Sequence, residues 1–269
     1  MNPERPISRR SALLFGTLVP AVAVASTMIP EGLVVQEKDL SEYQAGVIAH
    51  NACVNLTKFS NALGTQIPHI EVDLSSVHGR LIVGHSENEY LSMPIAQRDQ
   101  QALDVVFNKV YEAGKHPFLD LKDNTKGKEI YSRLPEYVRH DHLAMASSNN
   151  HNDLERLKKE GFPGIILFSL GDAKRVTDFL DISSGKTFAE GEYGVSIKHE
   201  LLSPFYASIF KKLGLLIASW NPKTESDIKR SLKSKADFIT SDEFKILEKI
   251  GKPAEILVTS EEPQSPPQG

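Results

Sequence analysis

Short apolar runs alternate with amphipathic stretches of helical length between Tyr43 and Gly251. Apolar runs of four to eight residues are typical of buried strands, and apolar positions three and four residues apart are typical of helices. The pattern predicts strands at 47–50, 69–74, 117–121, 143–147, 164–169, 194–198, 215–220 and 236–240. It predicts helices after them at 56–63, 94–113, 128–138, 152–160, 172–180, 204–213, 225–233 and 243–250.

Eight strand–helix units in succession predict an α/β fold, a single-domain (β/α)8 TIM barrel. Glycines stand just past four predicted helices, where a left-handed cap favours them: Gly64, Gly114, Gly161 and Gly214. The hydrophobic fraction of 40% is enough for one large core. The alternative is an open doubly wound sheet, which would favour a glycine-rich phosphate loop after its first strand. The segment after the first strand, HNACVN, is not such a loop.

The two ends of the chain differ in composition from the barrel, which is assigned to residues 43–251. Residues 1–25 have a basic start, a short apolar run and an Ala-x-Ala site, as expected for a signal peptide that exports the protein. Ser8-Arg9-Arg10 before Leu13 and Leu14 also resembles a twin-arginine signal, and an uncleaved membrane anchor is the alternative. Residues 26–42 are a lead-in, and the polar, proline-rich residues 252–269 are expected to be disordered.

Charge and cysteine content narrow the function classes. The net charge is −4, and it becomes −6 if the signal peptide, with its three arginines and one glutamate, is removed. An acidic chain without basic runs is a poor candidate for nucleic-acid binding. Cys53 is the only cysteine, so no intramolecular disulfide can form. It is expected to be a small buried residue rather than a nucleophile.

Acidic side chains recur on one face of two predicted strands. Glu71 and Asp73 are two residues apart, so both point into the barrel while their apolar neighbours face the helices. Asp120 and Lys122 repeat the arrangement on the next strand. Buried carboxylates side by side repel each other unless a cation lies between them. Glu71, Asp73 and Asp120 therefore predict one divalent ion, Mg2+ or Ca2+, with Lys122 as a fixed positive charge.

Other candidates lie where the strands of a barrel end, which is where such barrels carry their chemistry. His50 ends the first predicted strand, and His85 follows a short extended piece, RLIVGH, in the loop after the second. Trp220 ends the seventh strand and is a candidate substrate contact, although a lone tryptophan is more often a packing residue. Lys198 ends the sixth and is a candidate contact for an anionic substrate.

Together these residues resemble the glycerophosphodiester phosphodiesterase-like superfamily of TIM barrels. The likeness rests on a first-strand histidine, an E-x-D pair about twenty residues later, a second histidine and a carboxylate-x-Lys strand. The closing segment, LLIASWNPKTESDIKRSLKSKADFITSDEF, resembles the family's strand ending in Trp, helix, and strand ending in Thr-x-Asp. The usual His-Arg-Gly is His50-Asn51-Ala52 here, and Asp120 replaces the usual Glu. Both departures are similar to the sphingomyelinase D-like phospholipase D and menorin-type branches.

The resemblance implies a metal-dependent phosphodiesterase that cleaves glycerophosphodiesters or phospholipid headgroups. His50 and His85 would be general base and general acid, while Lys122 and Asn51 would contact the phosphate. A phospholipase D-like lyase that forms a cyclic phosphate is one alternative, and a non-catalytic barrel that binds a phosphate or lipid is another. The partner would be a small-molecule or lipid phosphodiester, with peripheral membrane contact in the lipid case. The sequence does not fix the oligomeric state.

Overall fold

The computed structural model describes residues 45–78, 80–122, 134–139 and 143–250. Its strands are β1 Gly46–Ala49, β2 His69–Val77, β3 Arg80–Val83, β4 His116–Leu121, β5 Met145–Ser148, β6 Ile165–Leu170, β7 Tyr193–Lys198, β8 Leu216–Trp220 and β9 Phe238–Ser241. Its α-helices are α1 Leu56–Leu63, α2 Glu87–Ser92, α3 Ile95–Gln100, α4 Leu103–Glu112, α6 His151–Lys159, α7 Ala173–Ser183, α8 Pro204–Lys212, α9 Glu225–Lys233 and α10 Phe244–Ile250. Ala52–Val54 and Leu134–Glu136 are single 3-10 turns.

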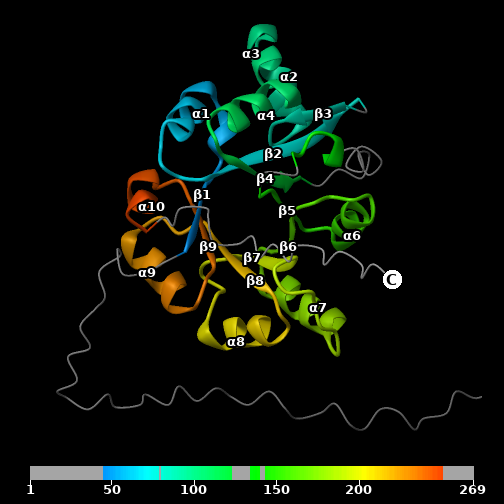
Figure 1. The fold of residues 1–269 in the computed structure, drawn as a ribbon, viewed down its shortest axis with the longest axis vertical. Helices are drawn as coiled ribbons and strands as arrows, with labels where there is room; N and C mark the ends of the chain where they lie inside the picture. The colour runs from blue at the N-terminus through cyan, green and yellow to red at the C-terminus, as the bar shows by residue number, and fades with distance from the viewer. Residues whose placement is uncertain (1–44, 79, 123–133, 140–142, 251–269) are drawn as a thin grey trace, which may run out of the picture. The chain divides into compact units, whose positions relative to one another are not determined.

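Eight parallel strands close into a barrel, which confirms the predicted fold. The sheet runs β1-β9-β8-β7-β6-β5-β4-β2-β3, and β1 also pairs with β2, so the ring is complete. Helices α6 to α10 surround the strands (Figure 1). The ninth strand, β3, is antiparallel to β2 and extends it as a hairpin beyond the ring. It is the extended piece before His85 that the sequence places in a loop.

Two apolar layers follow from the alternation of side chains along each strand. Ile70, Val72 and Leu74 of β2 are fully buried in the layer between strands and helices. A smaller cluster fills the barrel interior: Ile48, Phe118, Met145, Ile165, Leu167, Ala218 and Phe238. Gly46 has no side chain because a Cβ there would lie 2.3 Å from the Phe238 ring. The interior is therefore packed at its base, and the polar residues are displaced toward the mouth.

Two predicted helices differ from the structure. The helix expected over 94–113 is interrupted at Gln101 and Ala102, giving α3 and α4. Gln101 is buried, and its side-chain amide donates a hydrogen bond to the Cys53 carbonyl, 3.3 Å away, which requires the chain to turn there. Of the helix expected over 128–138, residues 128–133 lie outside the described ranges, and the turn at Leu134–Glu136 is 3-10. Cys53 is buried, as expected.

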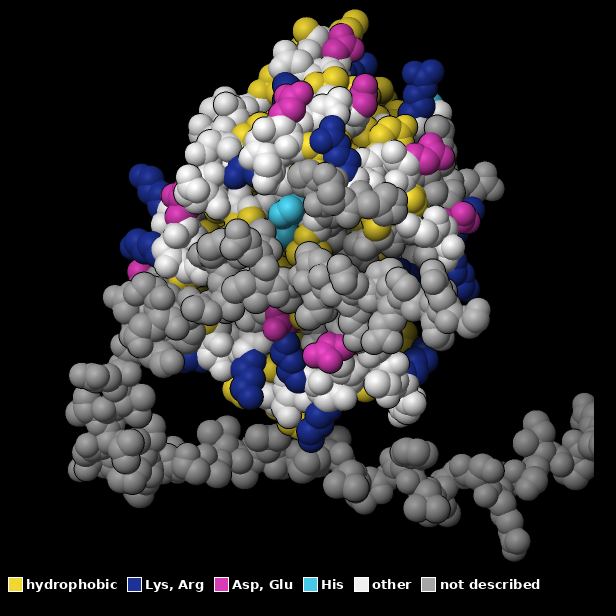
Figure 2. All heavy atoms as spheres, in the orientation of Figure 1, with side chains coloured by type: hydrophobic (Ala, Val, Ile, Leu, Met, Phe, Trp, Pro, Cys, Tyr) yellow, Lys and Arg dark blue, Asp and Glu magenta, His cyan; other side chains and the backbone are white. Residues whose placement is uncertain are grey.

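The predicted signal peptide, lead-in and tail lie outside the described residues. Within the described part of the chain, every helix is too short or too polar to cross a bilayer. Helices α2 and α3 project at the upper end of the view, where Figure 2 shows hydrophobic side chains at the tip. Leu91 and Ile95 of these helices are 42% and 72% exposed.

Phe238 provides a test of the packed barrel base. Replacing it with alanine would leave a cavity among Ile48, Phe118 and their neighbours, because Phe238 is only 1% exposed. We expect Phe238→Ala to lower the free energy of unfolding by about 3–5 kcal/mol. Phe205→Ala, at a 69% exposed position, is the control and should change it by less than about 0.5 kcal/mol. Equal effects in urea denaturation would contradict this account of the core.

Candidate active site

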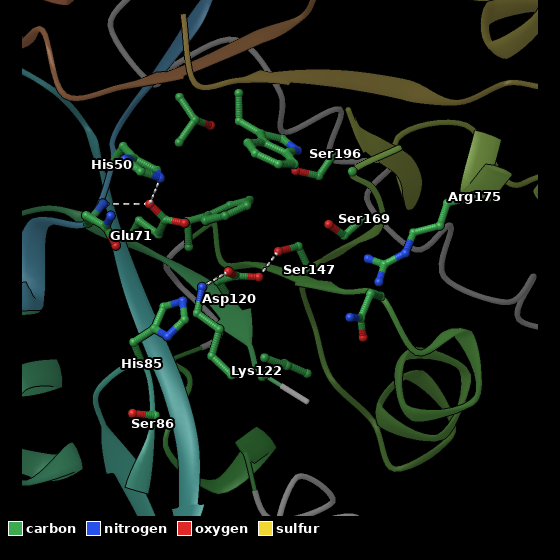
Figure 3. A pocket seen from close by; sticks show the side chains of 17 residues that line it. His50, Glu71, His85, Ser86, Asp120, Lys122, Ser147, Ser169, Arg175 and Ser196 are labelled. Atoms are coloured by element: carbon green, nitrogen blue, oxygen red, sulfur yellow. Dashed lines mark hydrogen bonds and ion pairs between the residues drawn. The ribbon is translucent and has the colours of Figure 1, made fainter. Parts of the chain in front are cut away.

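A cavity of about 580 Å3 lies at the mouth of the barrel, where the parallel strands end. Most of the predicted site residues line it: His50, Asn51, Glu71, His85, Asp120, Lys122 and Trp220. They come from distant parts of the sequence and meet because all parallel strands end at the same rim. Figure 3 shows the carboxylates at the centre of this group.

Three carboxylates converge at one side of the cavity. One ligand oxygen from each of Glu71, Asp73 and Asp120 lies within 4.8 Å of the other two. Asp73 and Asp120 are paired in register on β2 and β4, so the parallel ladder places them side by side. Glu71 and Asp73 are only 5% and 6% exposed. Hard oxygen donors at this spacing fit Mg2+ or Ca2+.

The pKa of Glu71 is raised to about 7, chiefly because burial disfavours its charged form. The charges of Asp73 and Asp120 raise it further, whereas His50 and the hydrogen bond from the Asn51 backbone lower it. That backbone N–H lies 2.7 Å from Glu71 Oε2. A cation bound among the carboxylates would relieve both the repulsion and the cost of burial, so the donor set fits a divalent ion.

Lys122 supplies a fixed positive charge beside the cluster. Its Nζ lies 2.9 Å from Asp73 Oδ1 and is hydrogen-bonded to Asp120 Oδ2. Burial lowers the pKa of Lys122, but the two carboxylates outweigh it and hold the pKa well above its usual value. On the other side, Ser147 Oγ donates a hydrogen bond of 2.7 Å to Asp120 Oδ1. Asp120 is therefore held on one side by Lys122, just after its own strand, and on the other by Ser147 of β5.

His50 is held by an acidic network on the side away from the cavity. Its Nδ1 lies 3.1 Å from Asp242 Oδ1, and Nε2 lies 3.8 Å from Glu71 Oε2. Asp242 also accepts hydrogen bonds from Lys58 Nζ, at 2.5 Å, and from Asn221 Nδ2, at 2.9 Å. Asn221 Nδ2 also lies 3.1 Å from His50 Nδ1, so Asp242 and Asn221 hold this nitrogen, and Nε2 is the ring nitrogen on the Glu71 side.

This network sets the charge state of the histidine. Burial lowers the pKa of His50, but the hydrogen bond to Asp242 and the charges of Glu71 and Asp242 raise it, and the net direction is upward. Burial raises the pKa of Asp242, yet the hydrogen bonds from His50, Lys58 and Asn221 hold it well below its usual value. Asp242 therefore stays ionised and stabilises the imidazolium form of His50.

The second histidine approaches the carboxylates from another direction. Figure 3 shows His50 and His85 on opposite sides of the cluster. His85 follows β3, whose pairing with β2 continues in a 2.9 Å hydrogen bond from the Gly84 N–H to the Asp73 carbonyl. It also lines a smaller cavity of about 140 Å3. The hairpin thus brings His85 to the mouth.

The remaining predicted residues divide into two groups. Asn51 and Trp220 line the cavity, and Asn51 has a left-handed backbone (φ 48°), which asparagine tolerates better than most residues. Lys198 is at the end of β7 but is not among the lining residues, and its Nζ lies 3.5 Å from Glu200 Oε1. Its role in substrate binding stays a prediction. Two further histidines do not line the cavity: His69 lies at the start of β2 and His78 in a turn.

Several site residues were not found from the sequence. Asp242 was visible only as the last residue of the Thr-x-Asp motif, and Lys58, Asn221 and Arg175 carried no local signal. The serines at positions 147, 169 and 196 also line the cavity. Their place on the inward face of β5, β6 and β7 could have been inferred from the same two-residue alternation that identified Glu71 and Asp73.

Solved structures with a similar fold exist, although no protein-family model and no curated protein matches the sequence. A glycerophosphodiester phosphodiesterase of Thermotoga maritima has a TM-score of 0.57 and 17% identity, with 76% of this chain and 97% of its own covered. The corresponding enzyme of Agrobacterium tumefaciens has a TM-score of 0.54 and 15% identity, covering 77% and 99%. A phosphodiesterase of Oleispira antarctica, in complex with the product sn-glycerol-3-phosphate, has a TM-score of 0.61 and 17% identity, covering 79% and 99%.

The chain has the barrel fold of the glycerophosphodiester phosphodiesterases. At these identities the likeness establishes the fold, and it confirms at that level the resemblance expected from the sequence. The resemblance to the sphingomyelinase D-like and menorin-type branches stays a prediction.

The carboxylate cluster predicts stabilisation by a divalent ion. At a concentration about 100 times its dissociation constant, Mg2+ or Ca2+ should raise the melting temperature by about 5–10 °C, since it binds only the folded chain. The shift should grow as the pH rises through about 7, because Glu71 must lose its proton to bind the ion. Glu71→Gln should remove most of the shift, and Asp178→Asn, at an exposed carboxylate, should keep it. An undiminished shift in Glu71→Gln would place the ion elsewhere.

The Asp242 network predicts the titration of His50. In Asp242→Asn the hydrogen-bonded charge is lost while burial remains, so the pKa of His50 should fall, as measured by NMR titration of the ring. In the wild type the raised pKa of His50 adds stability below its ordinary value of about 6.5, and this is lost as the pH rises through the folded-state pKa. The substitution should therefore destabilise the protein more at acidic than at alkaline pH. Glu243→Gln, at the neighbouring exposed carboxylate, should leave the titration unchanged; an equal fall there would contradict the assignment.

Proposed function

We propose that the chain is an exported, metal-dependent phosphodiesterase that cleaves glycerophosphodiesters or phospholipid headgroups. The observation that carries the proposal is the cluster of three carboxylates, Glu71, Asp73 and Asp120, at a cavity that a lysine and two histidines also line. Binding of a phosphate alone requires no pair of groups that exchange protons near neutral pH. Export is supported by the basic, apolar and Ala-x-Ala segments of residues 1–25.

The cluster and Lys122 would position and neutralise the phosphodiester. Glu71, Asp73 and Asp120 would hold Mg2+ or Ca2+, which when bound supplies Lewis-acid polarisation of a phosphoryl oxygen. Lys122, anchored by Asp73 and Asp120, would add a positive charge at a fixed place beside the phosphate. Asn51 replaces the arginine of the related motif. Lys122 and the ion must therefore provide most of the charge stabilisation.

The two histidines would move the protons of the reaction. One removes a proton from the attacking hydroxyl, and the other protonates the leaving alkoxide, so that neither a free hydroxide nor a free alkoxide is needed. The arrangement supports this division because His50 and His85 lie on opposite sides of the carboxylate cluster (Figure 3). Asp242 holds His50 by its Nδ1, which leaves Nε2 for the proton transfer. The attacking hydroxyl is either water or a hydroxyl of the substrate.

A lipid substrate would bring the mouth to a membrane surface. The exposed Leu91 and Ile95 support peripheral contact, since they lie on the helices that follow His85. A water-soluble glycerophosphodiester would need no such contact. The two substrate classes can be compared directly by offering the same headgroup free and in vesicles.

Phosphorus NMR tests the proposed reaction and its mode at once. The purified protein with Mg2+ or Ca2+ should convert members of a panel of glycerophosphodiesters and lysophospholipids to new phosphorus signals. A monoester signal identifies hydrolysis, and a cyclic phosphate identifies the lyase alternative. His50→Ala should reduce the rate about 10²- to 10⁴-fold, because it removes one proton-transfer group.

His78→Asn is the matched control, because His78 lies in a turn, is 80% exposed at its side chain and is not a cavity residue. It should keep the wild-type rate. A folded, ion-binding protein that turns over no panel member would favour the non-catalytic barrel. Equal losses of rate in His50→Ala and His78→Asn would contradict the assignment of the activity to this site.

A further inference from the structure

The far side of the cavity differs in chemistry from the side that holds the carboxylates. We call it the distal wall and define it by Asn149, Ser169, Gly171, Arg175 and Trp220, all of which line the cavity. A volume of about 580 Å3 far exceeds what one phosphate group fills, and it falls within the range of sites for whole small molecules. The part of the substrate attached to the phosphate must therefore contact the distal wall.

Arg175 places a guanidinium on this wall. It lies near the start of α7, which begins directly after the end of β6, and Figure 3 shows its side chain directed into the cavity. Asp172 lies beside it, with Oδ2 3.4 Å from Arg175 Nε. The two side chains are 46% and 56% exposed, so this ion pair holds the arginine only weakly. The other carboxylate oxygen of Asp172 caps the helix by accepting from the Arg175 N–H at 2.9 Å.

Gly171 keeps space open between the guanidinium and the tryptophan. A Cβ on Gly171 would lie 3.6 Å from Trp220 Cζ2 and 3.9 Å from Arg175 Nη1. The indole and the guanidinium therefore border the same small region. The cavity lining also includes neutral donor groups, because Asn149 carries an amide and Ser169 a hydroxyl.

The charges are distributed so that this region suits an anion. Among the described residues that line the cavity, the carboxylates are Glu71 and Asp120, and both belong to the carboxylate cluster. Lys122 is engaged there by Asp73 and Asp120. A cationic headgroup would find no carboxylate among the distal-wall residues, whereas a carboxylate or phosphate would meet the planar fork of Arg175.

We propose that the distal wall is a subsite for a second anionic group of the substrate, a carboxylate or a phosphate monoester, bound by Arg175. The inference rests on the proposed phosphodiesterase function and narrows its substrate class. The preferred diesters would carry this second charge a few atoms from the phosphorus that is attacked.

Matched substrates isolate this charge. Glycerophosphoserine and glycerophosphoethanolamine differ by one carboxylate, and glycerophosphoinositol 4-phosphate and glycerophosphoinositol differ by one phosphate. In at least one pair we expect kcat/KM to be about 10- to 100-fold higher for the more anionic member, as for a charge-assisted hydrogen-bonded pair. The pair that shows the preference identifies the anion. Ratios near one in both pairs would overturn the proposal.

Arg175→Gln should bring the ratio of the preferred pair close to one. Lys174→Gln is the matched control: it removes the same charge from the adjacent position, but Lys174 is 83% exposed and paired with Asp178, and it does not line the cavity. It should keep the wild-type ratio. A preference that survives Arg175→Gln, or that falls equally in Lys174→Gln, would rule out a subsite built on Arg175.

Calorimetric binding separates this inference from the catalytic proposal. In the presence of Mg2+, O-phosphoserine should bind more tightly than O-phosphoethanolamine, or inositol 1,4-bisphosphate more tightly than inositol 1-phosphate, and Arg175→Gln should remove the difference. Such a difference without turnover of any diester would support the subsite and refute the phosphodiesterase function. Turnover of diesters without a charge preference would support the phosphodiesterase function and refute the subsite.

Discussion

The closely spaced carboxylates of Glu71, Asp73 and Asp120 impose the constraint that organises the mouth of the barrel. Burial and the charges of Asp73 and Asp120 raise the pKa of Glu71 to about 7. The groups around them supply positive charge or hydrogen bonds: Lys122 between Asp73 and Asp120, Ser147 on Asp120, and the Asn51 backbone on Glu71. A divalent ion is the further partner that this oxygen-rich arrangement accommodates.

Closure of the barrel builds the support of His50. The histidine follows β1, Asp242 follows β9, and β1 and β9 are neighbours in the ring. Lys58 comes from α1 and Asn221 from the end of β8, and both donate to the same carboxylate. This arrangement keeps Asp242 charged and leaves Nε2 of the imidazole on the side of Glu71, which lines the cavity. The proton transfer proposed for His50 would therefore depend on groups that do not themselves line the cavity.

The two sides of the cavity differ in the charge of their side chains. One side carries the carboxylates with their lysine, and the opposite side carries Arg175, an indole and neutral donors. In a barrel, the rim residues come from different strand–helix units, so the chemistry and the recognition of the substrate can be built by separate parts of the chain. In the proposed reaction, residues on and after β1, β2 and β4 would supply the chemistry, and the segments after β5, β6 and β8 would supply the recognition.

The sequence by itself determined the strand order, the class of fold and the inward face of the acidic residues, because these depend on local periodicity and on the two-residue alternation of a strand. It also predicted the bounds of α1 and α9. The break between α3 and α4 was missed, since it depends on a contact between Gln101 and Cys53, 48 residues apart. Only the tertiary structure decided which residues support His50 and which line the cavity. Asp242 is 192 residues from His50, and Arg175 is a surface-type residue on an ordinary helix until the closed ring directs it into the cavity. No local pattern encodes such contacts, because they exist only once the first and last strands pair.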